Sequence, residues 1–171
     1  MKTLVISSSL SARSRSFLLC RRAAELLEQR GVELRFVDAR DVELTPTHRG
    51  ATEGMQELTT KVAWADSLVF GMGVHCYSVN DSLKIILDNC CGEATGKLFG
   101  VLCAAGGERS YLSTMHLTQI CMNEWRMMQL PRIVYATGGD FEGDKISNAD
   151  IEQRLETFAD EFSSVGEKLS N

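Results

Sequence analysis

Proline is scarce in this sequence, and long hydrophobic runs are missing from it. Two prolines among 171 residues, with 44% hydrophobic and 24% charged residues, exclude a collagen-like or disordered chain and favour a single domain spanning residues 1–171. No segment reaches the roughly 18 apolar residues that a membrane helix needs. The net charge of −5 supplies no basic field for nucleic acid or an anionic membrane, so we expect neither as a partner and favour a small molecule.

The C-x-x-C spacing of zinc and thioredoxin-like sites is also missing. Several cysteines lie in apolar runs, where a free thiol packs as a small hydrophobic side chain. Free thiols are typical of reducing compartments, and the first residues lack the apolar core of a signal peptide. We therefore expect a cytoplasmic protein with no disulfide framework and no metal site. The six cysteines are Cys20, Cys76, Cys90, Cys91, Cys103 and Cys121.

Short apolar segments alternate with helical patterns along the chain. Apolar segments at 4–6, 32–37, 67–72, 98–104 and 133–136 predict strands, and the two continuous runs at 67–72 and 98–104 indicate strands that helices cover on both faces. Helices are predicted near 17–30, 57–65, 81–88, 111–125 and 148–165, the last after an S-x-x-D capping box at Ser147. This alternation predicts an α/β fold, a doubly wound five-stranded parallel sheet with helices on both faces. Such sheets bind ligands beyond the carboxyl ends of their strands, which directs attention to the loops after the first, third and fourth strands.

The loop after the first strand, residues 8–16, combines five serines with two arginines. It leads into a helix, whose free N-terminal N–H groups attract anions, and its hydroxyl and guanidinium groups add donors that suit a phosphate. The loop is neither a Walker A sequence nor a G-x-G-x-x-G fingerprint. A phosphate site is the favoured interpretation, and a solvated helix cap is the alternative.

The loop after the third strand, residues 72–84, contains an imidazole, a thiol and a phenol at His75, Cys76 and Tyr77. These side chains suit a loop that wraps a flat heteroaromatic ring, but His75 and Tyr77 are equally consistent with side chains that only cover the edge of the sheet. A nucleophilic His75–Cys76 pair is disfavoured because adjacent loop residues seldom point at each other.

Paired glycines follow the fourth strand, at Gly106 and Gly107 after Ala105. Glycines let a backbone approach a ligand closely and present its N–H groups, and a plain tight turn is the alternative. A later glycine-rich loop, 138–144, is assigned no site because its three acidic residues argue against contact with a phosphate.

Together, the three loops resemble those of the NADPH-dependent FMN reductase family, a flavodoxin-like group that includes flavin, quinone and chromate reductases and azoreductases. The family's first loop reads G-S-x-R-x-x-S, and residues 8–14 stand in that place, with Ser11 where the family has arginine. The second family motif reads P-x-Y-x-x-S-x-x-x-x-L-K-x-x-x-D. Residues 73–88 match its L-K-x-x-x-D end, while Gly73 replaces the proline and His75 replaces the tyrosine.

The resemblance implies a flavodoxin-like FMN-binding domain, with NADPH or NADH as hydride donor and a flavin, a quinone or a similar small molecule as acceptor. Hydride transfer between stacked rings needs no general base, so no catalytic side chain is expected. The family also implies a homodimer or homotetramer, with the helix at Leu83–Lys84 near the contact. The implied phosphate ligands are Ser9, Ser11, Arg13, Ser14, Arg15 and Ser16. The implied ring contacts are Gly73, Val74, His75, Cys76, Tyr77 and Ser78 on one side, with Ala105, Gly106 and Gly107 on the other.

Two other functions stay open. A flavin-binding electron carrier or redox sensor would bind FMN without oxidising NAD(P)H, although the T-x-T-G-x-T loop of flavodoxin-type carriers is absent. A regulatory domain that has lost the flavin is the third interpretation, and Gly73 and His75 are the best evidence for it. A length of 171 residues leaves no room for a separate nicotinamide domain, so a reductase of this size must bind its hydride donor directly over the flavin.

Overall fold

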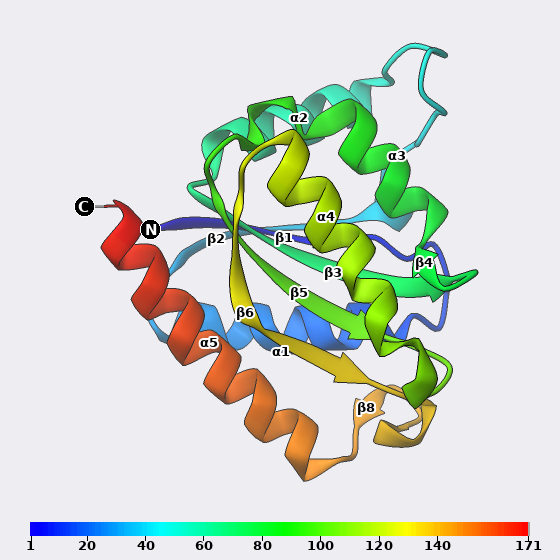
Figure 1. Ribbon diagram of the computed structural model, residues 1–171, viewed down its shortest axis with the longest axis vertical. Coiled ribbons are helices and arrows are strands. Elements are labelled where there is room, and N and C mark those ends of the chain that lie inside the picture. The colour runs from blue at the N-terminus through cyan, green and yellow to red at the C-terminus, as the bar shows by residue number, and fades with distance from the viewer. Residues whose placement is uncertain (171) are drawn as a thin grey trace.

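The computed structural model describes residues 1–170 and contains a central parallel sheet (Figure 1). Five main strands lie in the order β2-β1-β3-β5-β6, and a short sixth strand, β4, pairs antiparallel with the end of β3. All neighbours among the main five are parallel, which confirms the predicted α/β architecture. The strands are β1 (Lys2–Ser7), β2 (Glu33–Asp38), β3 (Ser67–His75), β4 (Ser78–Val79), β5 (Leu98–Ala104) and β6 (Met128–Ala136).

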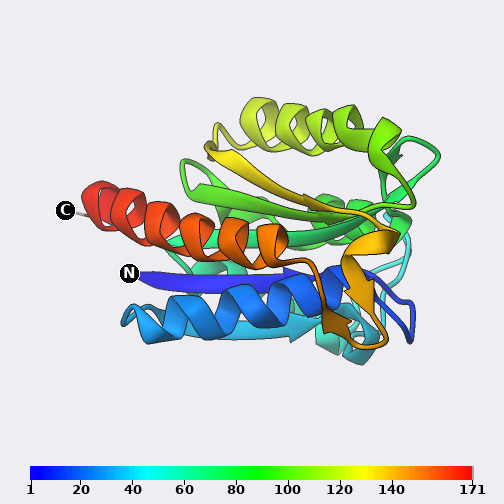
Figure 2. The same ribbon diagram turned by 90° about the horizontal axis from the view of Figure 1, so that it is seen from below.

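Helices cover both faces of the sheet, as predicted (Figures 1 and 2). Helices α1 and α5 lie side by side and pack on Val5 and Val69, whereas α2, α3 and α4 pack on Ile6 and Phe70. Successive side chains of a strand point to opposite faces, so a strand between two helical layers must be apolar at every position. The helices are α1 (Arg15–Gln29), α2 (Glu53–Trp64), α3 (Asp81–Cys90), α4 (Thr114–Glu124) and α5 (Ala149–Ser170).

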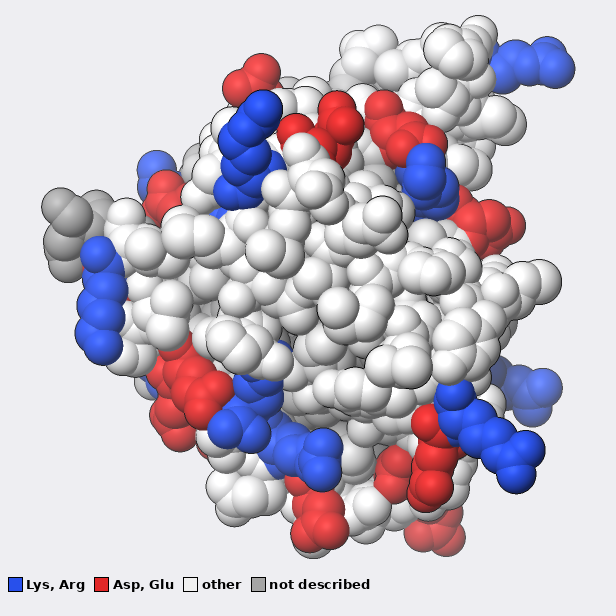
Figure 3. Space-filling model, viewed as in Figure 1, with Lys and Arg blue, Asp and Glu red and all other residues white. Residues whose placement is uncertain are grey.

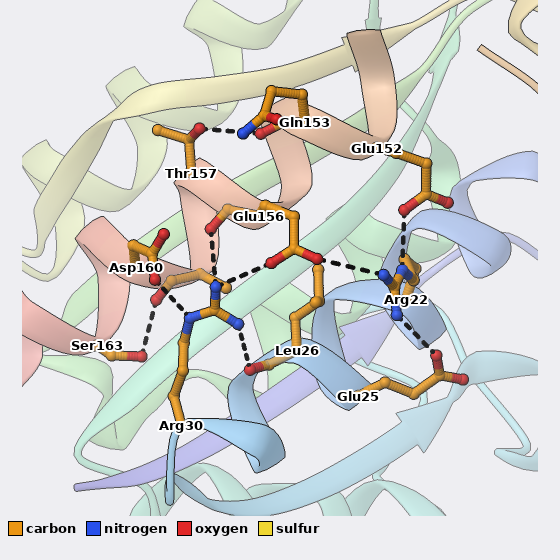
Figure 4. Close-up of polar contacts among 11 residues, drawn as sticks. Arg22, Glu25, Leu26, Arg30, Glu152, Gln153, Glu156, Thr157, Asp160 and Ser163 are labelled. Atoms are coloured by element: carbon orange, nitrogen blue, oxygen red, sulfur yellow. Dashed lines mark hydrogen bonds and ion pairs between the residues drawn. The ribbon is translucent and has the colours of Figure 1, made fainter. Parts of the chain in front are cut away.

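The packing of α5 depends on a glycine and on ion pairs with α1. A Cβ atom at Gly100 would lie 2.5 Å from Cζ of Phe158, so only a glycine lets that ring reach the sheet. Arg22 Nε lies 2.9 Å from Glu152 Oε2, and further ion pairs join α1 to the same face of α5 (Figure 4). These charged groups are partly exposed, so each pair contributes at most about 1 kcal/mol and the buried aromatic contacts supply most of the stability.

The start of α5 differs from the predicted one. Its cap is Asn148, whose Oδ1 accepts a hydrogen bond of 2.9 Å from the Asp150 N–H, so the capping box predicted at Ser147 is wrong. The Ser147 N–H donates to the carbonyl of Asp140 instead, which holds Ser147 in the connection before the helix.

Two other boundaries also shift. Helix α2 begins at Glu53, ahead of the expected residue 57, because Thr52 Oγ1 accepts a hydrogen bond of 3.2 Å from the Met55 N–H. Strand β6 runs through Pro131, which is tolerated because β6 is an edge strand and its register with β5 shifts around Gly100.

The glycine-rich segment after β6 is ordered by Asp140. Its carboxylate accepts hydrogen bonds of 2.6 Å from both the Thr137 N–H and Asn148 Nδ2. Burial favours a higher pKa for Asp140, but the hydrogen bonds from Thr137 and Asn148 outweigh it and lower the pKa below its ordinary value. The segment forms a short helix, η4 (Gly138–Asp140), and a hairpin of β7 (Phe141–Glu142) and β8 (Lys145–Ile146).

All six cysteines are free, and five of them are buried while Cys76 is exposed. Burial raises the pKa of Cys103 and of Cys121 to about 12, so these thiols stay protonated at neutral pH and are poor nucleophiles. No helix within residues 1–170 is long and apolar enough to cross a bilayer. Nor does this part of the chain bring three or more His, Cys, Asp or Glu side chains together in a way that would hold a metal ion.

Candidate functional site

The carboxyl ends of β1, β3 and β5 bring the three predicted loops to one edge of the sheet. Ser7 pairs with Gly71, and Gly73 pairs with Ala104, so these strand ends lie beside one another. The chain leaves β1 for α1 on one face of the sheet, but it leaves β3 for α3 on the other face. Strand order therefore reverses at β1 and β3, which is where doubly wound sheets open a crevice for a ligand.

Two serines of the first loop lie at the N-terminus of α1. Ser14 is the N-cap residue, and its Oγ accepts a hydrogen bond of 3.1 Å from the Phe17 N–H. The Oγ atoms of Ser14 and Ser16 are 3.1 Å apart, and the two residues are only 7% and 2% exposed. Hydroxyl groups and the positive end of the helix dipole thus converge at one point, as an anion site requires.

The rest of the first loop folds on itself. Ser9 Oγ accepts from the Ser11 N–H, and Ser11 Oγ accepts from the Arg13 N–H, each at 3.3 Å. Arg13 is exposed and has no ion-pair partner in the described part of the chain, so its charge is available to a ligand.

The two predicted arginines have different surroundings. The guanidinium carbon of Arg15 lies 5.7 Å from the centre of the Phe141 ring, and a Cβ atom on Gly138 would lie 2.7 Å from Arg15 Nη1. Arg15 therefore packs against the segment after β6, for which the sequence predicts no site. The structure brings this segment to the predicted phosphate loop.

The second loop is a tight hairpin between β3 and β4. His75 pairs with Ser78, and the two residues between them, Cys76 and Tyr77, have φ angles of 48° and 60°. Such turns favour Asn-Gly, because side chains larger than hydrogen are strained there, by roughly 1 kcal/mol or more per residue. Tertiary contacts hold this turn in place, since Tyr77 Oη donates to the Arg109 carbonyl at 3.0 Å.

Other side chains of this hairpin point in different directions. Ser78 Oγ lies 2.9 Å from His116 Nδ1 on α4, and Val74 packs into the core beneath α3 and α4. His75 Nδ1 lies 3.5 Å from Asp81 Oδ1, and its side chain is exposed. The partner of His75 is thus Asp81 rather than Cys76, which agrees with the rejection of a nucleophile pair.

The third loop is fixed by tyrosines from both sides. Tyr135 Oη on β6 donates to the Gly107 carbonyl at 2.5 Å, and Tyr77 holds Arg109 as described above. The Ala105 N–H donates to the Ala136 carbonyl at 2.9 Å, so Ala105 is part of the sheet edge. Beyond this loop the chain forms a short helix, η3 (Glu108–Ser113), before α4.

Open space lies over three of the predicted glycines. A Cβ atom on Gly73, Gly106 or Gly107 would meet no atom within 4 Å, so the backbone there is accessible to a flat ligand. At the end of β1, Ser7 Oγ is fully buried and has no hydrogen-bond partner among residues 1–170. A buried hydroxyl without a partner is energetically costly.

Sequence reasoning missed a buried polar cluster between the first two loops, formed by Ser8, Asn80 and Ser82. Asn80 precedes a helix and Ser8 stands in a serine-rich loop, so each has the ordinary signature of a cap or a turn. The one sequence signal for this cluster is that Ser8 follows β1 and that Asn80 and Ser82 lie after β3, the strand beside β1.

Comparison with known proteins agrees with this geometry. The profile of the NADPH-dependent FMN reductase family matches residues 1–142. No curated protein matches the sequence.

Several solved structures share the fold. An NADH:FMN oxidoreductase (EMOB) in its apo form is 18% identical, with a TM-score of 0.81 over 96% of this chain and 89% of its own. A flavoenzyme NAD(P)H:(acceptor) oxidoreductase, FerB from Paracoccus denitrificans, is 19% identical, with a TM-score of 0.75 over 98% of this chain and 97% of its own. A flavodoxin from the domain Archaea is 13% identical, with a TM-score of 0.71 over the full length of both chains. These likenesses show a flavodoxin-like fold, and because the family profile covers the strands and loops that build the site, this chain belongs to the NADPH-dependent FMN reductase family.

Proposed function

We propose that this protein is an NAD(P)H-dependent, FMN-containing oxidoreductase that passes hydride from a nicotinamide to flavin and on to free flavin, a quinone or another small acceptor. One observation carries the proposal: the hydroxyl-lined N-terminus of α1 opens on the same edge of the sheet as the uncovered backbone of Gly73, Gly106 and Gly107. An anion site beside a flat, open surface suits a phosphorylated ring cofactor.

The residues of the first loop suit the phosphate of FMN. Ser14 and Ser16, together with the free N–H groups of α1, supply hydrogen-bond donors, and Arg13 supplies the positive charge. Ser9 and Ser11 form the turns that lead up to Arg13. We assign Arg15 to the edge of this site, where Gly138 and Phe141 hold its side chain.

The second and third loops suit the ring. When bound, FMN supplies the centre that accepts and releases the hydride. Open space lies over the backbone at Gly106 and Gly107, whose N–H groups would stabilise negative charge on a bound ring. The tyrosine contacts keep this backbone in place before a ligand arrives. His75, Cys76 and Tyr77 are exposed, and Tyr77 bonds to the Arg109 carbonyl beyond the third loop, so we assign these three residues to the border of the ring site.

The surface over α4 suits contact with a second copy of the chain. Exposed apolar side chains lie along η3 and α4 at Leu112, Met115 and Met122. In Figure 3 a broad uncharged area covers this part of the molecule, with charges around its rim. We propose a homodimer or homotetramer, which the family resemblance implies with the helix at Leu83–Lys84 near the contact. We extend the proposed contact to this apolar area, and light scattering at micromolar protein concentration tests the oligomeric state.

Two measurements test the proposed activity. The purified protein is titrated with FMN while flavin fluorescence is followed, and the loaded protein is then mixed with NADPH or NADH and an acceptor while nicotinamide absorbance is recorded. We expect micromolar or tighter FMN binding and acceptor-dependent loss of the nicotinamide signal. FMN binding without nicotinamide oxidation would indicate an electron carrier or redox sensor, and no FMN binding at micromolar concentrations would refute the proposal.

A further inference from the structure

Asn80 occupies the N-cap position of α3 without capping that helix. An asparagine at this position usually accepts a hydrogen bond from an early N–H group of the helix. Its side chain makes no such bond here, and Asp81 Oδ1 accepts from the Ser82 N–H at 2.9 Å instead. Asn80 is only 1% exposed, so its amide is fully committed to contacts inside the protein.

Those contacts join the first loop to the end of β3. Asn80 Oδ1 accepts a hydrogen bond of 3.1 Å from the Gly73 N–H and lies 3.1 Å from Ser8 Oγ. Asn80 Nδ2 donates to the Ser8 carbonyl at 3.2 Å and to Ser82 Oγ at 2.8 Å. Ser82 Oγ in turn donates to the same Ser8 carbonyl at 2.5 Å. One buried amide therefore contacts both the phosphate side and the ring side of the candidate site.

The two sides of the site differ in their other supports. On the ring side, Gly73 pairs with Ala104 in the sheet, and Tyr77 and Ser78 bond to Arg109 and His116. On the phosphate side, the hydrogen bonds of residues 9–13 run only within the loop, as far as the structure describes them. The first loop is anchored at one end by Ser14, the N-cap of α1. Its other end depends on Ser8, which bonds to the Gly71 backbone and to the Asn80 and Ser82 side chains.

We propose that Asn80 is a positioning residue that couples the phosphate half of the flavin site to its ring half, an inference that rests on the proposed FMN-dependent function. Without the amide, Ser8 keeps its hydrogen bonds to the Gly71 carbonyl and to Ser82 Oγ but loses its link to the ring side. The first loop is then held less firmly, and more of it must be ordered when a phosphate binds. This ordering lowers the affinity gained from the phosphate. The ring contacts keep their own supports and change little.

Riboflavin provides the matched ligand because it has the ring of FMN but no phosphate. The variants Asn80→Ala and Ser82→Ala are compared with Asn89→Ala, a control on the same helix whose amide donates to the Ile85 carbonyl away from the three loops. Dissociation constants for FMN and for riboflavin are measured by fluorescence titration. We expect Asn80→Ala to reduce the preference for FMN over riboflavin at least tenfold, Ser82→Ala to reduce it by a smaller factor, and Asn89→Ala to leave it unchanged.

A wild-type preference in both Asn80→Ala and Ser82→Ala would overturn the inference. Equal weakening of FMN and riboflavin would also overturn it, because that result describes a general loss of structure. If Asn80→Ala does not fold, Ser82→Ala decides the matter, since it removes one hydroxyl and keeps the amide. Failure of the wild-type protein to bind FMN would refute the proposed function itself, a result distinct from either outcome above.

Discussion

Substitutions at Ser14 separate helix capping from phosphate binding. The Ser14 hydroxyl caps α1 by accepting from the Phe17 N–H, and we assign it to the phosphate of FMN. Asparagine and aspartate are as good as serine at an N-cap, so Ser14→Asn and Ser14→Asp both keep the cap. The two variants have the same shape and differ by one negative charge.

The charge sets the expected difference in FMN affinity. Two unit charges about 4 Å apart near a protein surface interact by roughly 4 kcal/mol at an effective dielectric constant of about 20. Ser14 lies beside the exposed Arg13, so solvent screens part of this repulsion. If only a third of it remains, about 1.4 kcal/mol, Ser14→Asp binds FMN about tenfold more weakly than Ser14→Asn.

Fluorescence titrations with FMN and riboflavin at low and high salt measure this effect. We expect Ser14→Asp to bind FMN at least tenfold more weakly than Ser14→Asn, both variants to bind riboflavin equally, and the FMN difference to shrink as salt increases. Thermal melts check that the two variants fold with similar stability. Equal FMN affinities for the two folded variants would show that the N-terminus of α1 does not hold the phosphate.

Three further predictions concern the site and its surroundings. Gly73→Ala should leave the melting temperature unchanged, because the new Cβ atom meets no atom within 4 Å. The same methyl group enters the space that we assign to the ring, so FMN titrations should show binding weakened several-fold. Unchanged FMN binding would place the ring elsewhere. In thiol labelling of the folded protein, Cys76 should react quickly while the five buried cysteines do not, and FMN should slow its reaction; labelling that FMN leaves unaffected would remove Cys76 from the site. The pKa of Asp140 is lowered in the folded state, so its ionised carboxylate stabilises the protein at pH values above the ordinary aspartate pKa near 3.9. This stabilisation is lost as the pH falls through the pKa of the folded state. Thermal melts from pH 6 to pH 2.5 should therefore show a smaller loss of stability for Asp140→Asn than for the wild type, and parallel curves would contradict the assigned hydrogen bonds.

The pattern of apolar residues along the chain predicted the sheet correctly. Predictions from local sequence failed where contacts between distant residues determine the structure. The apolar runs at 67–72 and 98–104 require helices on both faces, and the structure confirms this. Its spacing from Asp150 predicts Ser147 as a cap, but the Ser147 N–H donates to the Asp140 carbonyl and Asn148 caps the helix. A tertiary hydrogen bond thus moved the start of α5.

The arginines of the first loop show the same limit. By sequence, Arg13 and Arg15 are equivalent positive charges in one loop. In the fold both arginines are exposed, but Arg15 also packs against Gly138 and the Phe141 ring in the segment after β6. The acidic residues of the 138–144 loop argue against contact with a phosphate, but the Asp140 carboxylate accepts hydrogen bonds from Thr137 and Asn148 and is not a free charge.

The class of fold, the order of its elements and the three loops that can form a site follow from apolar runs and helical periodicity, which are properties of neighbouring residues. The way in which those loops are joined depends on the packing of the strands. Asn80 and Ser8 are 72 residues apart, and they meet because β1 and β3 lie side by side at the point where strand order reverses. The Cys76–Tyr77 turn likewise depends on the carbonyl of Arg109, which lies in η3 after β5. Contacts of this kind depend on the order of the strands in the sheet, and local sequence patterns do not specify that order.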